Sequence, residues 1–67
     1  MGPLAMLFRI CRRGMPSRWV VLLDDSFYGA YADKDDALLD AVEAATDARD
    51  RGSEAEVWDQ IKAVRLY

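Results

Sequence analysis

Apolar residues in the first half of the chain fall into three short segments that are separated by turn residues. Residues 13–17 include Gly and Pro, and residues 24–26 read Asp-Asp-Ser, and both compositions favour turns. The segments around these turns are rich in β-branched and aromatic residues, which is typical of strands. We therefore expect a meander of three strands, over residues 4–12, 18–23 and 27–31. The middle segment contains the uninterrupted run Trp-Val-Val-Leu-Leu, which indicates a central strand covered on both faces.

A helical pattern follows the meander. Asp33 is a good N-cap, Asp36 stands at the third helical position, and Gly52 is the residue expected just past a helix end. We therefore expect a helix from about Lys34 to Arg51. At about 100° per residue, its apolar side consists of Leu38, Ala41, Val42, Ala45 and Ala48. Partial alternation predicts a fourth strand over residues 53–59, and a short fifth strand is expected within residues 61–67.

These elements predict a single α+β domain over residues 1–67. The domain is an antiparallel sheet of three to five strands with one amphipathic helix packed on one face, in the order β-β-β-α-β. Residues 1–5 are an extension if the protein starts at Met6. One helix covers only one face of a sheet, so the other face must be polar, short, or packed against a second copy.

Charge is distributed unevenly along the chain, although the net charge is only −3. Residues 1–23 carry four arginines and no acid, residues 24–59 carry all twelve acids against three cations, and residues 60–67 carry two cations. The central segment therefore has a charge of −9, which disfavours direct binding to nucleic acid. The arginines are expected at a hairpin tip, where they pair with acids of this chain or another copy, or contact a partner: Arg9, Arg12, Arg13 and Arg18.

Five acids of the expected helix follow one line along its outer side. Their spacings of 4, 3, 4 and 3 residues keep all of them within roughly 40° of that line, which is about 21 Å long. Lys34 and Arg51 flank the line and Arg49 lies near the apolar side, so no regular basic partner is expected on this face. We call this group the acidic stripe; it consists of Asp36, Asp40, Glu43, Asp47 and Asp50.

The acidic stripe has two interpretations. It is either a solvated face that keeps the protein soluble, or an imitation of a phosphate row that occupies a basic groove on a DNA- or RNA-binding protein. Phosphates on a DNA strand recur on a comparable scale, at about 3.4 Å of axial rise. Solubilising faces usually mix both signs, so five acids in register are less expected of one. In the second interpretation Asp33, the cap, lies at the rim of the partner-binding surface.

Other residue types that carry chemistry are scarce or poorly arranged. The chain has no histidine and one cysteine, Cys11, so it has no internal disulfide and hardly any ligands for structural zinc. Residues 24–35 partly follow a calcium-loop pattern, but Tyr28 stands where an oxygen ligand is required. Carboxylates on a surface helix lack the cleft that adjusts pKa values for acid–base catalysis. We therefore expect that the protein is not an enzyme and that it has no catalytic, cofactor-binding or metal-binding residues.

The single cysteine suits a reducing cytoplasm. The apolar N-terminus is short and lacks the basic leader and cleavage site of a signal peptide. No stretch approaches the ~20 apolar residues that span a bilayer. We therefore expect a cytoplasmic protein that does not bind membranes.

The segments between residues 19 and 61 follow a characteristic order: a Trp-x-Val strand, an aromatic residue, a Lys-acid-acid-Ala helix start, an alanine-spaced helix, a Gly and an apolar strand. This order resembles a family of short bacterial domains of unknown function, whose helix starts with Thr-Lys-Glu-Glu-Ala. The family's closing Asp-x-Asp-Gly turn is replaced here by Asp59-Gln60. The resemblance implies an α+β fold and no particular activity. Its counterparts here are Trp19-Val20-Val21, Phe27, Asp33-Lys34-Asp35-Asp36-Ala37, Ala41, Ala45, Gly52 and Val57-Trp58.

In size and charge the chain is also similar to small acidic phage proteins that block bacterial defence, including anti-CRISPR proteins, several of which mimic DNA. The expected function is therefore a phage or bacterial protein-binding domain that acts as a nucleic-acid mimic and inhibits a basic nucleic-acid-binding protein. The alternative is a small structural or adaptor domain that forms a homodimer through its uncovered sheet face. Trp19, Val21 and Phe27 would then be the anchors, and the acids would only solubilise.

Overall fold

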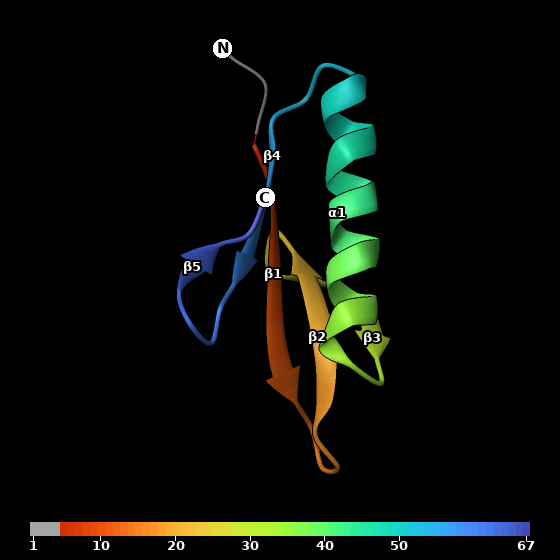
Figure 1. Cartoon of the computed structure of the whole chain (residues 1–67), viewed down its shortest axis with the longest axis vertical. Helices are drawn as coiled ribbons and strands as arrows, with labels where there is room; N and C mark the ends of the chain where they lie inside the picture. The colour runs from red at the N-terminus through yellow and green to blue at the C-terminus, as the bar shows by residue number, and fades with distance from the viewer. Residues whose placement is uncertain (1–4) are drawn as a thin grey trace.

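The computed structural model describes residues 5–67, in which five strands form one sheet and a single helix packs against it (Figure 1). This confirms the predicted α+β fold, whereas Leu4 and the first residues of the expected extension lie outside the described residues. The strand order in the sheet is β3-β2-β1-β4-β5, with the helix between β3 and β4 in the chain. The elements are β1 (Met6–Arg13), β2 (Arg18–Leu23), β3 (Ser26–Tyr31), α1 (Lys34–Asp50), β4 (Ala55–Asp59) and β5 (Val64–Arg65).

The sheet is mixed, so the expectation of purely antiparallel pairing was wrong for one pair of strands. β4 pairs with β1 in parallel, with Met6 opposite Ala55 and Ile10 opposite Asp59. The cause is the helix, which starts beside the end of β3 and carries the chain back along the sheet over about 25 Å. β4 therefore begins at the same end as β1, and such a crossover is what parallel strands require.

Local sequence signals place the turns and the helix ends. Asp24 and Asp25 both have positive φ, 50° and 69°, as the two central residues of a type I′ hairpin turn require. The Asp33 side chain accepts a hydrogen bond from the backbone N–H of Asp36 at 3.0 Å, which confirms the predicted cap. The helix ends at Asp50, one residue before the predicted end, and Gly52 follows in the left-handed conformation.

The main core lies between α1 and one face of the sheet, which we call the covered face. Fully buried side chains from β1, β2 and β4 meet the helix there: Phe8, Ile10, Val21 and Val57. The helix contributes only small residues to its buried line, namely Ala37, Ala41, Ala45 and Ala48. Leu38 and Val42, which were predicted to lie on this line, are only partly buried at its side. Alanines let the helix approach the sheet closely, so longer side chains are pushed to the flank.

On the opposite face, which we call the open face, no helix or strand of residues 5–67 is packed. This face nevertheless holds a second apolar cluster of Cys11, Val20 and Leu22, each at most 7% exposed. The apolar run of β2 thus serves two clusters, because its side chains alternate between the two faces. The second face has no covering layer, contrary to the prediction from that run.

Candidate functional site

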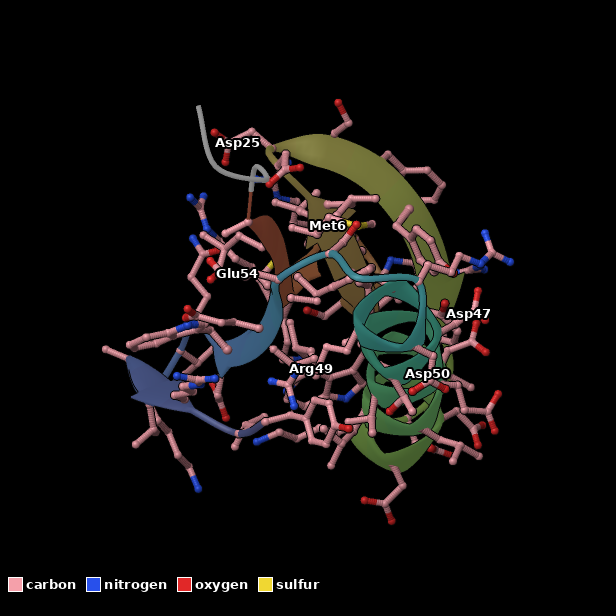
Figure 2. The ribbon with its side chains drawn as sticks, turned by 90° about the horizontal axis from the view of Figure 1, so that it is seen from above. Met6, Asp25, Asp47, Arg49, Asp50 and Glu54 are labelled. Atoms are coloured by element: carbon pink, nitrogen blue, oxygen red, sulfur yellow. The ribbon has the colours of Figure 1, made fainter. Side chains whose placement is uncertain are left out.

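All five residues of the acidic stripe are exposed, on a side of α1 away from its buried alanines. At Asp40 this side reaches β3, because Asp40 contacts Tyr31. Figure 2 looks along the helix and shows Asp47 pointing outward, whereas Arg49 turns back toward β4. Asp33 at the cap is also exposed. The stripe is therefore one continuous surface of a single helix.

Two of the five acids have a contact within the molecule. Asp47 forms an ion pair with Arg51 at 3.0 Å, one helical turn away, and both side chains are largely exposed. Asp40 accepts a hydrogen bond of 2.6 Å from the Tyr31 hydroxyl. Burial of Tyr31, and next this hydrogen bond to Asp40, raise the pKa of the tyrosine, so its hydroxyl stays a donor. Among residues 5–67, the side chains of Asp36, Glu43 and Asp50 have no hydrogen-bond or ion-pair partner.

The helix is attached to the sheet and the C-terminal segment along its length. At its start, Lys34 donates to the Asp59 carboxylate at 2.5 Å. In its second half, the hydroxyls of Thr46 and Tyr67 lie 2.8 Å apart. Near its end, the Arg49 guanidinium donates two hydrogen bonds to the carbonyl oxygen of Ala55, at 3.0 and 2.7 Å. These contacts fix the stripe in position, and they turn Lys34 and Arg49 away from it.

Asp59 is the one buried charged residue among those described, at 1% exposure. The hydrogen bond from Lys34, followed by that from the backbone N–H of Lys62, holds the pKa of Asp59 below its ordinary value of 3.8. The N–H of Ile61 also donates to it. All these partners are structural, because they close the turn after β4 and tie it to the helix. The sequence alone did not indicate this role, because Asp59 stood out only as part of the Asp59-Gln60 replacement of the family's Asp-x-Asp-Gly turn.

An apolar residue, Leu39, lies within the acidic surface of the helix. Its side chain is 60% exposed. Leu39 lies 60° from Asp36 around the helix, and it faces almost directly away from the buried alanines. Sequence reasoning missed it, although helical spacing alone separates it from the apolar side. Single exposed apolar side chains are common on protein surfaces, so Leu39 by itself does not indicate a function.

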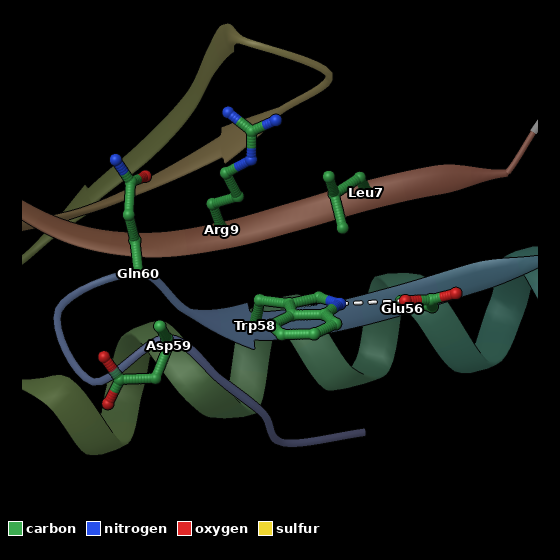
Figure 3. Close-up of a pocket in the computed structure, with 7 residues that line it drawn as sticks. Leu7, Arg9, Glu56, Trp58, Asp59 and Gln60 are labelled. Atoms are coloured by element: carbon green, nitrogen blue, oxygen red, sulfur yellow. Dashed lines mark hydrogen bonds between the residues drawn. The ribbon is translucent and has the colours of Figure 1, made fainter.

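The open face contains two hollows. The first, of about 380 Å³, lies between β1, β4 and the turn after β4, on the side of the sheet opposite α1 (Figure 3). The indole N–H of Trp58 donates to Glu56 beside it at 2.8 Å. The second, of about 490 Å³, lies toward the tip of the β1–β2 hairpin and contains Phe27 and Met15, which are 70% and 99% exposed.

Arginines frame the open face. Arg9, which lines the first hollow, pairs with Asp25, which lines the second. Arg65 lies 4.0 Å from Glu56. Arg13 and Arg18 line the second hollow, and no carboxylate of the described residues pairs with either.

Two expectations about the sheet are corrected by its register. Trp19 and Val21 were named as anchors of a dimer through the uncovered face, but both contact the main core on the covered face. Only Phe27 of the three lies on the open face. Cys11 is buried in the second cluster.

The chain matches no protein family model, and no curated protein or solved structure matches it. The resemblance to short bacterial domains therefore stays a prediction. In the part of the chain that the structure describes, no three Cys, Asp or Glu side chains converge as metal ligands would. No helix among residues 5–67 is both long and apolar enough to cross a bilayer.

Proposed function

We propose that the protein inhibits a basic DNA- or RNA-binding protein by placing the acidic stripe where the nucleic-acid backbone binds. The observation that carries this proposal is the exposure of all five carboxylates on the outer side of one helix that is fixed to the sheet. The stripe extends about 21 Å, so it spans several phosphates of a strand. A rigid row of charges binds with a smaller entropic cost than a flexible one.

The contacts of the stripe favour this use. Asp36, Glu43 and Asp50 have no side-chain partner among residues 5–67 and are open to a partner protein, and the cations Lys34 and Arg49 are engaged on the sheet side. The Asp47–Arg51 pair is exposed and contributes at most about 0.5 kcal/mol, so a partner arginine displaces Arg51 easily. In this proposal the protein acts in the cytoplasm of bacteria, as an anti-CRISPR-like phage protein or a bacterial regulator, and Asp33 lies at the rim of the contact.

A second candidate function is that of an adaptor domain that self-associates through the open face. The specific observation in its favour is the exposure of Phe27 and Met15 beside the apolar cluster of that face. Here the acids would only solubilise the assembly.

The proposed function is tested by charge reversal with a matched control. The double variant Asp36→Lys, Glu43→Lys removes two unpaired stripe acids, and the control Asp35→Lys, Glu54→Lys makes the same change in net charge at exposed acids off the line. Immobilised protein is exposed to bacterial lysate at about 50 mM salt, and captured proteins are eluted with duplex DNA or RNA. We expect the wild type and the control to capture the same nucleic-acid-binding protein, and the stripe variant to lose it.

The proposal fails if the control loses the partner as fully as the stripe variant, because net charge alone would then explain the capture. It also fails if nucleic acid does not displace the captured protein. Circular dichroism of both variants shows that the helix is intact, so that a loss of capture reports on the stripe alone.

A further inference from the structure

The second hollow of the open face and the outer side of α1 carry opposite charges, and each has an exposed apolar side chain. The hollow combines exposed Phe27 with two unpaired arginines, Arg13 and Arg18. The helix combines exposed Leu39 with the carboxylates of Asp36 and Glu43 on neighbouring turns. We propose that a second copy of this chain inserts Leu39 into the hollow, with its acids against Arg13 and Arg18, so that copies associate head to tail.

Charge on the open face argues for this arrangement and against a symmetric pairing of two open faces. Two carboxylates line the hollows and are not turned toward the core. Asp25 already pairs with Arg9, and Glu56 already lies beside Arg65. Two open faces brought together would therefore confront the unpaired arginines of both copies, and like charges in such a contact are unfavourable. The outer side of α1 presents carboxylates instead.

Apolar groups on both surfaces argue in the same direction. Leu39, Phe27 and Met15 are 60%, 70% and 99% exposed in the single chain. A docked helix removes all three from water at once. Arg13 and Arg18, at the rim, meet the acids that surround the leucine, and this pattern of an apolar centre with a charged rim is typical of protein interfaces.

The contact joins two different surfaces, so it leaves one hollow and one helix free at the ends of every pair. Such heterologous contacts grow into rings or open chains rather than stopping at a dimer. They also cover part of the acidic stripe, so a partner of the stripe and a second copy compete for it. The contact itself does not depend on the proposed function.

Two variants test the contact and spare the stripe acids. The helix variant, Leu39→Lys, removes the inserted side chain, and the hollow variant, Arg13→Gln, Arg18→Gln, removes the rim charges; all three residues are exposed, so the fold is retained. In sedimentation velocity at low salt, with protein up to about 1 mM, we expect the wild-type mass to rise beyond two chains of 7.6 kDa. The self-association of each variant alone should be weaker than that of the wild type by roughly ten-fold or more.

A mixture of the two variants gives the decisive result. The intact helix of the hollow variant fits the intact hollow of the helix variant, so a 1:1 mixture should form a heterodimer that cannot grow. Salt of about 500 mM should dissociate it. Persistent self-association of Leu39→Lys, a monomeric wild type at the highest concentration, or the absence of the mixed dimer would each overturn the proposal. Capture of a partner from lysate by the wild type is measured separately and tests the proposed function.

Discussion

Both faces of the sheet carry an apolar cluster with residues from β1 and β2, but the two clusters are shielded from water in different ways. On the covered face, Phe8 and Val21 are sealed by a helix whose contact line consists of alanines. On the open face, Val20 and Leu22 are buried although no helix among residues 5–67 covers them. The long aliphatic stems of arginine can shield such a surface while their charged ends stay in water.

The same contrast holds for the ion pair on each face. Asp59 and Lys34 form a pair whose carboxylate is buried and receives two further backbone N–H groups. In the pair of Arg9 with Asp25, by contrast, the carboxylate is 73% exposed. The comparison teaches that the covered face holds the fold together, whereas the open face, with its free arginines and exposed Phe27, is available for contacts.

The largest expected difference is between the two phenylalanines. Phe8→Ala should lower the free energy of unfolding by about 3–5 kcal/mol, because it removes a fully buried ring and leaves a cavity. Phe27→Ala should lower it by less than about 0.5 kcal/mol, because that ring is mostly in water. Urea denaturation of both variants measures the two values, and similar losses would show that the open face is part of the core.

The next difference is between the two acids of the ion pairs. Asp59→Asn should cost about 2–3 kcal/mol, since it removes the partner of Lys34 in a buried place. Asp25→Asn should cost under about 1 kcal/mol, because the Asp25 carboxylate is mostly exposed and asparagine tolerates the left-handed backbone of the turn. Thermal melts at neutral pH compare the variants, and equal shifts in Tm would contradict the distinction between the faces.

A pH effect should follow from the same buried carboxylate. The folded state lowers the pKa of Asp59 below the ordinary value of 3.8, so its contribution to stability is fully present above that value. That contribution is lost as the pH falls through the folded pKa. Between about pH 5 and pH 2, the free energy of unfolding should therefore fall more steeply with decreasing pH for the wild type than for Asp59→Asn. Parallel curves would mean that the pair with Lys34 does not persist in solution.

The smallest expected change in stability comes from the helix surface. Arg51→Ala should change the free energy of unfolding by no more than about 0.5 kcal/mol, because its pair with Asp47 is exposed. If the stripe binds a basic groove, this variant should bind its partner a few-fold more tightly, since Asp47 is then unpaired. Titration of the captured partner measures this, and weaker binding would indicate that Arg51 itself contacts the partner.

Local signals predicted the elements because each rests on neighbouring residues. The cap at Asp33, the turn at Asp24-Asp25 and the left-handed Gly52 all follow from backbone geometry within a few positions. The five stripe acids share a side because helical spacing alone decides it. The parallel pairing of β1 with β4 was not predicted, since it depends on where a 17-residue helix returns the chain.

Side-chain partners were the least predictable feature of the candidate site. Asp59 and Lys34 are 25 residues apart, and Asp40 and Tyr31 are nine apart on different elements. Nothing in their local sequence indicates that they meet. The assignment of Trp19 and Val21 to the open face was wrong because alternation along a strand separates two sets of residues but does not say which set meets the helix.

The order of apolar, polar and turn residues by itself determined the number and type of elements, the helix cap and the alignment of the acidic stripe, because these depend on spacings within one segment. Tertiary structure alone decided which face of β2 the helix covers, which acids are paired, and that Arg13, Arg18 and Phe27 share a hollow. Those outcomes depend on contacts between distant segments, and their energies arise only when the sheet and helix pack together.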